Sequence, residues 1–122
     1  MPKKKFYSLC RYVDKTDGDI KVGYLPREGA DVPNDLGFDL AVYRATDESV
    51  VTNYRDTKTW FVVDTRTGLS VGQGDTKNKA IDVALSRLET LDKDEYRKAA
   101  KDTEDKYGPV PGHRITYNFL VV

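Results

Sequence analysis

The sequence predicts an α+β domain: a mostly antiparallel β-sheet with two consecutive helices packed on one face and a C-terminal strand. Three observations lead to this fold class. Alternating, aromatic-rich segments separated by turn signals occupy most of residues 5–72, a helical apolar period follows over 75–107, and a β-rich segment occupies 113–122. Consecutive strands joined by tight turns favour antiparallel pairing. The length of 122 residues fits one domain spanning 1–122.

The first predicted element is a β-hairpin. Residues 5–13 (KFYSLCRYV) are rich in aromatic and β-branched side chains, Asp17-Gly18 is a turn signal, and 20–25 (IKVGYL) forms the returning strand. The next segment, 26–37 (PREGADVPNDLG), holds two prolines and two glycines. We therefore expect a long loop there, and loops of this length often carry function.

Three or four further strands are expected before the helices. Residues 38–45 (FDLAVYRA) form one strand, and 50–54 form a short strand or an extended connection. Residues 59–64 (TWFVVD) and 69–72 (LSVG) flank the tight turn TRTG and so predict a second hairpin.

Two helices follow this hairpin. Asp75 and Thr76 are both good N-caps for the first helix, and Asp92 with Glu95 resembles a capping box that starts the second. Gly108-Pro109 ends the second helix. The predicted inner stripes are Ile81, Ala84, Leu85, Leu88 and Leu91 in the first helix, and Tyr96, Ala99, Ala100, Thr103 and Tyr107 in the second.

Composition excludes several classes of protein. Lys plus Arg and Asp plus Glu both total 20, and this zero net charge argues against a binder of bulk nucleic acid and against an acidic DNA mimic. The single cysteine cannot form an internal disulfide. No run reaches the roughly 18 apolar residues of a membrane span, and no apolar region follows the basic start MPKKK, so we expect a cytoplasmic protein without a signal peptide.

The segment 72–77 (GQGDTK) is a strand-to-helix turn. Free N–H groups at a helix start bind phosphates, and Lys77 would add charge, but Asp75 would repel an anion. The segment matches neither a Walker A loop nor a dinucleotide fingerprint. Plain turn-and-cap chemistry is the favoured interpretation.

Catalytic and metal sites find little support in the sequence. Cys10 and His113 are the one Cys–His pair available, and a mid-strand cysteine is more often an inert, buried small hydrophobe. The tripeptide Asp19-Ile20-Lys21 has the spacing of a metal-dependent nuclease motif but lacks its context. We therefore expect no catalytic residue, no metal and no cofactor.

Arginine and aromatic residues are the strongest binding signal. The chain holds 8 Tyr, 4 Phe and 1 Trp, and arginines such as Arg11, Arg44 and Arg114 lie among strand aromatics. Aromatic faces stack on bases and guanidinium groups match phosphates, although half-exposed antiparallel sheets also look like this. We expect these side chains to contact a ligand: Arg27, Arg55, Trp60, Arg66 and Lys77.

The last strand, 115–122, is apolar. It must dock within its own sheet or against a second copy, so a homodimer or higher oligomer is an open alternative to docking within one chain.

The stretch 60–81 (WFVVDTRTGLSVGQGDTKNKAI) resembles a hairpin-then-helix unit of small phage and mobile-element proteins. These include the anti-Thoeris sponge family, which traps cyclic ADP-ribose signals. The resemblance is carried by Trp60, the turn 67–69, Gly74, Thr76-Lys77 and Ala80-Ile81, and it covers less than a fifth of the chain. It implies a non-enzymatic binder of a nucleotide-like signal, with an oligomeric state among the forms it allows, and it transfers no ligand contact.

Three functional hypotheses follow. The first is a cytoplasmic, phage-encoded anti-defence protein that sequesters a small phosphorylated, nucleotide-like ligand. The second is a protein-directed inhibitor of a host defence complex, of the anti-CRISPR or anti-restriction kind, acting through a flat sheet or the 26–37 segment. The third is a metal-dependent nuclease that uses Asp19.

Overall fold

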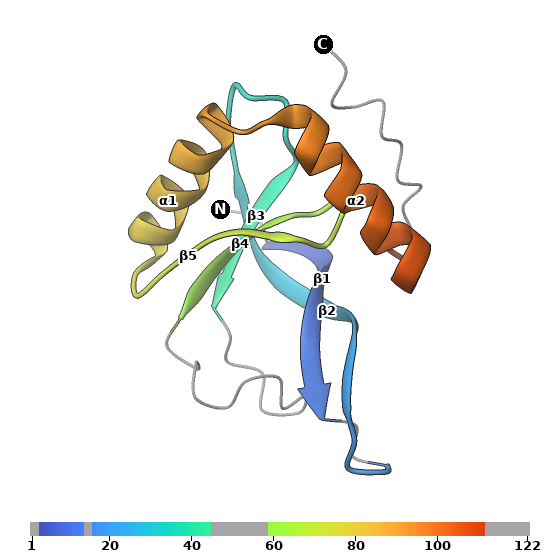
Figure 1. Ribbon diagram of the computed structural model, residues 1–122. Helices are drawn as coiled ribbons and strands as arrows, with labels where there is room; N and C mark the ends of the chain where they lie inside the picture. The colour runs from blue at the N-terminus through green and yellow to red at the C-terminus, as the bar shows by residue number, and fades with distance from the viewer. Residues whose placement is uncertain (1–2, 14–15, 45–58, 112–122) are drawn as a thin grey trace.

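A computed structural model describes residues 3–13, 16–44 and 59–111. In these ranges five strands form one antiparallel sheet in the order β1-β2-β3-β4-β5, and two helices pack on one face (Figure 1). The predicted α+β class and the two helices are thus confirmed. The predicted C-terminal strand at 113–122 and the segment 50–54 lie outside the described residues. The elements are β1 Lys3–Val13, β2 Ile20–Val32, β3 Leu40–Arg44, β4 Trp60–Asp64, β5 Ser70–Gly74, α1 Lys77–Glu89 and α2 Lys93–Tyr107.

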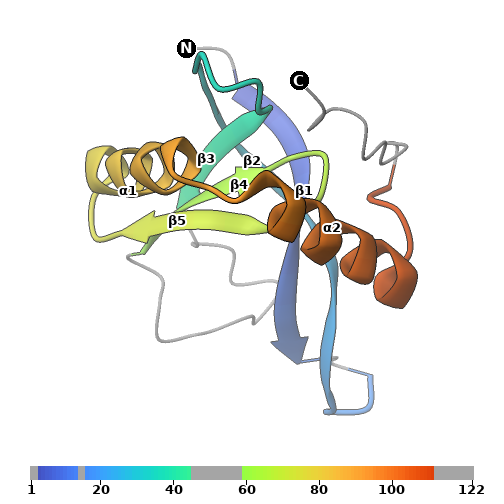
Figure 2. The same cartoon turned by 45° about the horizontal axis from the view of Figure 1, so that its top comes forward.

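The first hairpin is longer than the sequence suggests. β1 and β2 pair from Lys3–Ala30 to Val13–Ile20, and the arm projects away from the helices (Figure 2). The predicted loop at 26–37 is wrong over its first half, because β2 runs through Pro26 to Val32. Proline fits there because β2 pairs with β3 only through 30–32, so the missing N–H falls in a part of β2 that has a single strand neighbour.

The second hairpin is confirmed and fixes the turn between β4 and β5. The Asp64 carbonyl accepts the N–H groups of Thr67 at 3.2 Å and Gly68 at 2.8 Å. The Leu9 N–H donates to the Gly68 carbonyl at 2.8 Å, so the outer edge of β1 meets this turn. The sheet therefore curls until its first strand reaches the far hairpin.

Both helices begin where the sequence predicts. The Thr76 hydroxyl accepts the Lys79 N–H at 3.1 Å, and the Asp92 carboxylate accepts the Asp94 and Glu95 N–H groups. α2 ends at Gly108, whose N–H donates to the Glu104 carbonyl at 2.7 Å. Of the predicted stripes, Ala84, Leu88, Tyr96 and Ala100 are buried, and the half-buried Ile81, Leu85 and Leu91 pack against the core. Ala80 is buried in addition, whereas the prediction for Ala99 is wrong because this residue is exposed.

Glycine at position 72 lets α1 lie close to β5. A Cβ atom there would come within 2.7 Å of both the Cβ atom and the main-chain nitrogen of Ala84. The glycine of this strand-to-helix segment thus serves helix–sheet packing, in agreement with the plain structural interpretation.

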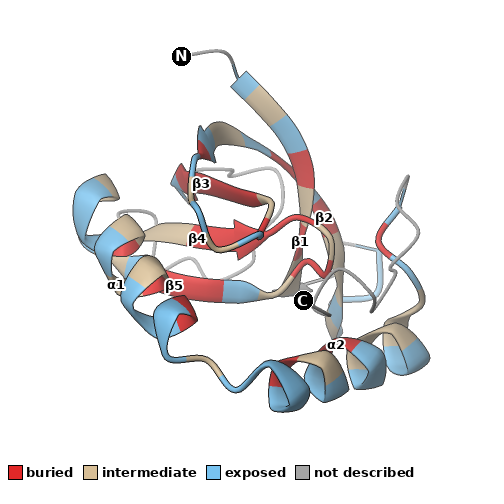
Figure 3. Ribbon diagram, turned by 90° about the horizontal axis from the view of Figure 1, so that it is seen from above, coloured by how far each residue is buried: buried red, intermediate tan, exposed pale blue. Residues whose placement is uncertain are grey.

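The main core lies between the sheet and the helices. Figure 3 shows the buried positions gathered on β3, β4, β5 and the inner side of α1. Leu40, Val62 and Ala84 are fully buried in this layer. A second cluster occupies the other sheet face, where Phe6, Tyr43 and Val63 pack together. In the described ranges, neither helix is long and apolar enough to cross a membrane.

Candidate functional site

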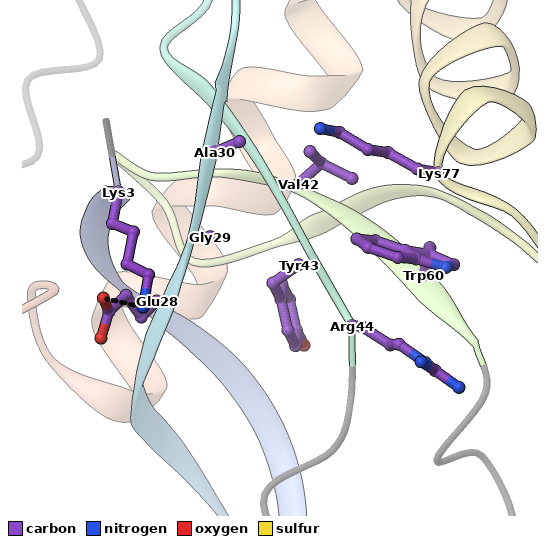
Figure 4. A pocket seen from close by; sticks show the side chains of 9 residues that line it. All are labelled: Lys3, Glu28, Gly29, Ala30, Val42, Tyr43, Arg44, Trp60 and Lys77. Atoms are coloured by element: carbon purple, nitrogen blue, oxygen red, sulfur yellow. Dashed lines mark ion pairs between the residues drawn. The ribbon is translucent and has the colours of Figure 1, made fainter. Parts of the chain in front are cut away.

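A cavity of about 510 Å³ opens where β2 and β3 part (Figure 4). β2 pairs with β3 through 30–32 alone, at its C-terminal end; the part of β2 before Ala30 pairs with β1, while Tyr43 and Arg44 of β3 continue along β4. The gap between the diverging strands forms the cavity. Its lining residues are Lys3, Glu28, Gly29, Ala30, Val42, Tyr43, Arg44, Trp60 and Lys77.

Gly29 marks the point of divergence. A Cβ atom at this position would lie 2.1 Å from the Val42 carbonyl oxygen and 3.0 Å from the Tyr43 Cβ atom. Only glycine allows the main chains to approach this closely before they separate. The cavity therefore depends on a residue that the sequence analysis placed in a loop.

One wall of the cavity combines a ring with two cations. Arg44 and Trp60 are directly opposed in the β3–β4 ladder, and Lys77 is the first residue of α1. Trp60 and Lys77 are half-buried, whereas Arg44 is exposed. Figure 4 shows all three side chains on the same side of the cavity, with the Trp60 ring between the Lys77 ammonium and the Arg44 guanidinium, which point in opposite directions. Two adjacent strands and the start of α1 thus place a positive charge on either side of the indole ring.

The opposite wall carries an ion pair. The Lys3 ammonium lies 3.5 Å from a Glu28 carboxylate oxygen, and their side chains are 80% and 47% exposed. The β1–β2 register sets Glu28 opposite Lys5, which places its carboxylate at the cavity mouth. An exposed pair of this kind adds little stability. Its effect is to balance the charge of this wall.

The cavity is positively charged overall. Three cations and one carboxylate line it, a formal balance of +2 over the described lining residues. Neither Arg44 nor Lys77 forms an ion pair with any carboxylate that the structure describes. Among the described residues of the cavity lining, the positive charges without a carboxylate partner are therefore those of Arg44 and Lys77, the two residues that share a wall with Trp60.

Tyr43 lines the cavity, and its ring is held in place by contacts with side chains outside the cavity lining. Its ring packs against Phe6 and Phe61, each at 5.6 Å between centroids, and the Arg27 guanidinium lies 5.0 Å from its centroid. Burial, and to a smaller extent the nearby Cys10, raises the pKa of Tyr43 to about 12. The hydroxyl therefore stays neutral and donates to the Ser8 hydroxyl at 3.4 Å.

The structure brings two of the five predicted ligand residues together. Trp60 and Lys77 line the cavity. Arg27 is buried behind Tyr43, where its Nε donates to the Ser8 hydroxyl at 3.2 Å. Arg66 lies in the β4–β5 turn, at the far end of β4 from Trp60. Arg55 lies outside the described residues.

Among the residues that the structure describes, the other candidates from the sequence are not gathered into a site. Cys10, for which the strand pattern suggested burial, is half-buried, and its Sγ lies 3.0 Å from the Ser8 hydroxyl. His113 lies outside the described residues. Asp19 is at the tip of the first hairpin, where the Lys21 ammonium pairs with Asp17 at 2.9 Å. In ranges 3–13, 16–44 and 59–111, no three acidic, His or Cys side chains are grouped to hold a metal ion.

Four charged or aromatic lining residues were missed as ligand contacts by the sequence analysis: Lys3, Glu28, Tyr43 and Arg44. Glu28 was assigned to a loop, so its pairing with β1 was not considered. Arg44 and Tyr43 were noted among strand aromatics, and their opposition to Trp60 and Phe61 would have followed from the strand register.

Comparison of the chain with protein-family models, curated proteins and solved structures finds no match. The cavity is therefore interpreted from its own chemistry.

Proposed function

We propose that this protein binds a small anionic ligand that contains a planar ring, of the nucleotide class, in the cavity between β2 and β3. The observation that carries the proposal is the grouping of Trp60 with Arg44 and Lys77, two cations without a described carboxylate partner. A ring stacks on the indole while an anionic group meets the cations.

Magnitudes support this assignment. Stacking of a base on an aromatic side chain contributes about 1–3 kcal/mol. The cavity volume of about 510 Å³ falls within the range of small-molecule sites, roughly 300–1,000 Å³. Because the cations lie at a half-open surface, their attraction for the ligand is moderate and weakens with salt.

The proposed role is capture of the ligand without chemical conversion. The lining provides a ring, cations and apolar strand positions, which are groups that recognise a ligand. In the anti-defence setting that the resemblance of 60–81 implies, such capture would sequester a signalling nucleotide in the host cytoplasm. The setting rests on that resemblance, and the ligand chemistry rests on the cavity.

A thermal-shift panel followed by calorimetric titration tests the proposal. Ligand at 100 times its dissociation constant stabilises the folded state by about 2.7 kcal/mol, which raises the melting temperature by several degrees. The panel includes linear and cyclic nucleotides and inorganic pyrophosphate. We expect a shift with nucleotides that the double variant R44A/K77A loses.

The matched control is K98A/K101A, which removes the same charge from exposed positions of α2. If K98A/K101A weakens binding as strongly as R44A/K77A, the effect is one of net charge and the cavity is not the site. A panel without any shift would contradict the proposal.

A protein-directed inhibitor is a second candidate because of the first hairpin. Ile20 and Val22, in the part of β2 that pairs with β1 alone, are 68% and 40% exposed. A quantitative pull-down with a defined defence complex separates the two candidates. Capture lost in I20S/V22S and kept in R44A/K77A favours the protein partner, and the reverse dependence favours the cavity.

A further inference from the structure

The two walls of the cavity differ in charge. Arg44 and Lys77 leave positive charge beside Trp60, whereas Lys3 and Glu28 balance each other on the opposite wall. We infer that the cavity contacts its ligand at two ends. The anionic group of the ligand lies on the wall of Arg44 and Lys77, and a neutral hydrogen-bond donor of the ligand, a hydroxyl or an amino group, lies at Glu28. This inference rests on the proposed function and adds the orientation and the chemistry of the second end.

The Glu28 carboxylate can accept further hydrogen bonds. Its distance of 3.5 Å to the Lys3 ammonium is long for a charge-assisted hydrogen bond, which is usually about 2.7–2.9 Å. An ionised carboxylate offers about four lone-pair directions. No other described residue donates a hydrogen bond to it. A ligand donor can therefore bind there without displacing a protein partner.

Electrostatics decides which end goes where. An anionic group next to Glu28 would meet a like charge, whereas the same group on the wall of Arg44 and Lys77 meets only opposite charges. A cationic group at Glu28 would meet the Lys3 ammonium. A neutral N–H or O–H donor avoids both repulsions, so the Glu28 wall selects it.

Nucleotides carry such donors in two places. Acidic side chains accept hydrogen bonds from ribose hydroxyls in dinucleotide-binding proteins, and amino groups on the base offer the same chemistry. The shared requirement is a donor at the end remote from the phosphate-binding cations. Analogues that remove one source at a time identify which source is used.

Calorimetric titrations with three probes test this inference. The probes are adenosine monophosphate, its 2′,3′-dideoxy analogue, which lacks the sugar hydroxyls, and inosine monophosphate, which lacks the amino group. We expect the wild-type chain to bind one analogue about tenfold or more weakly than adenosine monophosphate, because a hydrogen bond to a charged group is lost. Discrimination against the dideoxy analogue assigns the hydroxyls, and discrimination against inosine monophosphate assigns the amino group.

The variant E28Q links this discrimination to Glu28. It keeps the size of the side chain but removes its charge, so the preference should shrink to about threefold or less while R44A/K77A still abolishes binding. Inorganic pyrophosphate should bind E28Q at least as tightly as wild type, since a repulsive charge is gone. Melting temperature confirms that E28Q is folded.

Two results overturn the inference alone: a wild-type chain that binds all three nucleotides equally, or an E28Q variant that keeps the full preference. A wild-type chain that binds none of the nucleotides overturns the proposed function and the inference with it.

Discussion

The Tyr96 hydroxyl of α2 donates a hydrogen bond to the fully buried Asp64 carboxylate at 2.7 Å. The Thr67 hydroxyl lies 3.1 Å from the same tyrosine oxygen, and the second Asp64 oxygen accepts the Arg66 N–H at 3.0 Å. One carboxylate thus ties α2 to the β4–β5 turn. Burial raises the pKa of Asp64 and, together with that carboxylate, the pKa of Tyr96.

Replacing Tyr96 with Phe should destabilise the protein by about 1.5–3 kcal/mol, because a buried, charged acceptor loses its hydroxyl donor. The free energy of unfolding from urea titration measures this change. The matched control is Y107F, in the last turn of the same helix, where the hydroxyl is half-exposed. We expect Y107F to cost less than about 0.5 kcal/mol. Equal costs for the two variants would contradict a specific role for the Tyr96–Asp64 bond.

The raised pKa of Asp64 predicts a pH-dependent difference between wild type and D64N. In the folded state the pKa of Asp64 is raised above its ordinary value of 3.8. The folded state therefore holds the Asp64 proton more tightly than the unfolded state does. The stabilisation from this proton is fully present below 3.8 and is lost as pH rises through the folded-state pKa. D64N lacks this contribution. Wild type should therefore gain stability relative to D64N between about pH 7 and about pH 4.

Urea unfolding of both chains at several pH values measures that difference. Other carboxyl groups are common to both chains and largely cancel. Asp39 is the exception, because its charge, besides burial, raises the pKa of Asp64; burial raises its own pKa, but Lys4, Thr65 and Arg66 together outweigh burial and give a net lowering. The raised pKa of Asp64 would be refuted if the difference in unfolding free energy between the two chains did not change with pH, or if acidification stabilised D64N relative to wild type.

The close approach at Gly29 predicts that G29A damages both the fold and the cavity. The new Cβ atom would lie 2.1 Å from a main-chain oxygen, so β2 must move away from β3. Overpacking of this kind costs about 1–3 kcal/mol. Ligand affinity of the folded variant should fall as well, because the cavity lies at this divergence. A stable G29A protein with wild-type affinity would show that the strands do not set the cavity.

We predict that Arg66 does not contribute to ligand binding. It was selected from the sequence with Trp60, yet the turn places it at the far end of β4. R66A should leave the affinity for nucleotides within about twofold, since surface charges separated by more than a Debye length of about 8 Å are screened. Calorimetric titration of R66A beside R44A makes the comparison. A loss in R66A that matches the loss in R44A would move the site to the turn.

Local patterns were sufficient to predict most of the fold. Alternating side chains with turn signals predicted both hairpins, and the capping residues Thr76 and Asp92 fixed both helix starts. The segment 26–32 was misjudged because Pro26 and Gly29 are read as loop residues in isolation. Only the strand pairing shows that a proline is tolerated there, because β2 has β1 as its single strand neighbour at Pro26.

The candidate site depends on long-range register, which local patterns do not contain. Trp60 and Lys77 were identified as aromatic and basic residues next to turns. Glu28 joins them in one cavity only because β2 is not paired with β3 before Ala30. A lone arginine in a sequence does not show whether it lines a cavity, as Arg44 does, or supports a ring from behind, as Arg27 does.

Trp60 is the one tryptophan in the chain, so its fluorescence reports on the cavity directly. The most direct measurement is a titration of that emission with adenosine monophosphate, with free N-acetyltryptophanamide as the inner-filter control. The structure predicts a saturable change in emission that is kept in K98A/K101A and lost in R44A/K77A. An unchanged emission up to about 1 mM, the limit of weak specific binding, would contradict a nucleotide site at Trp60.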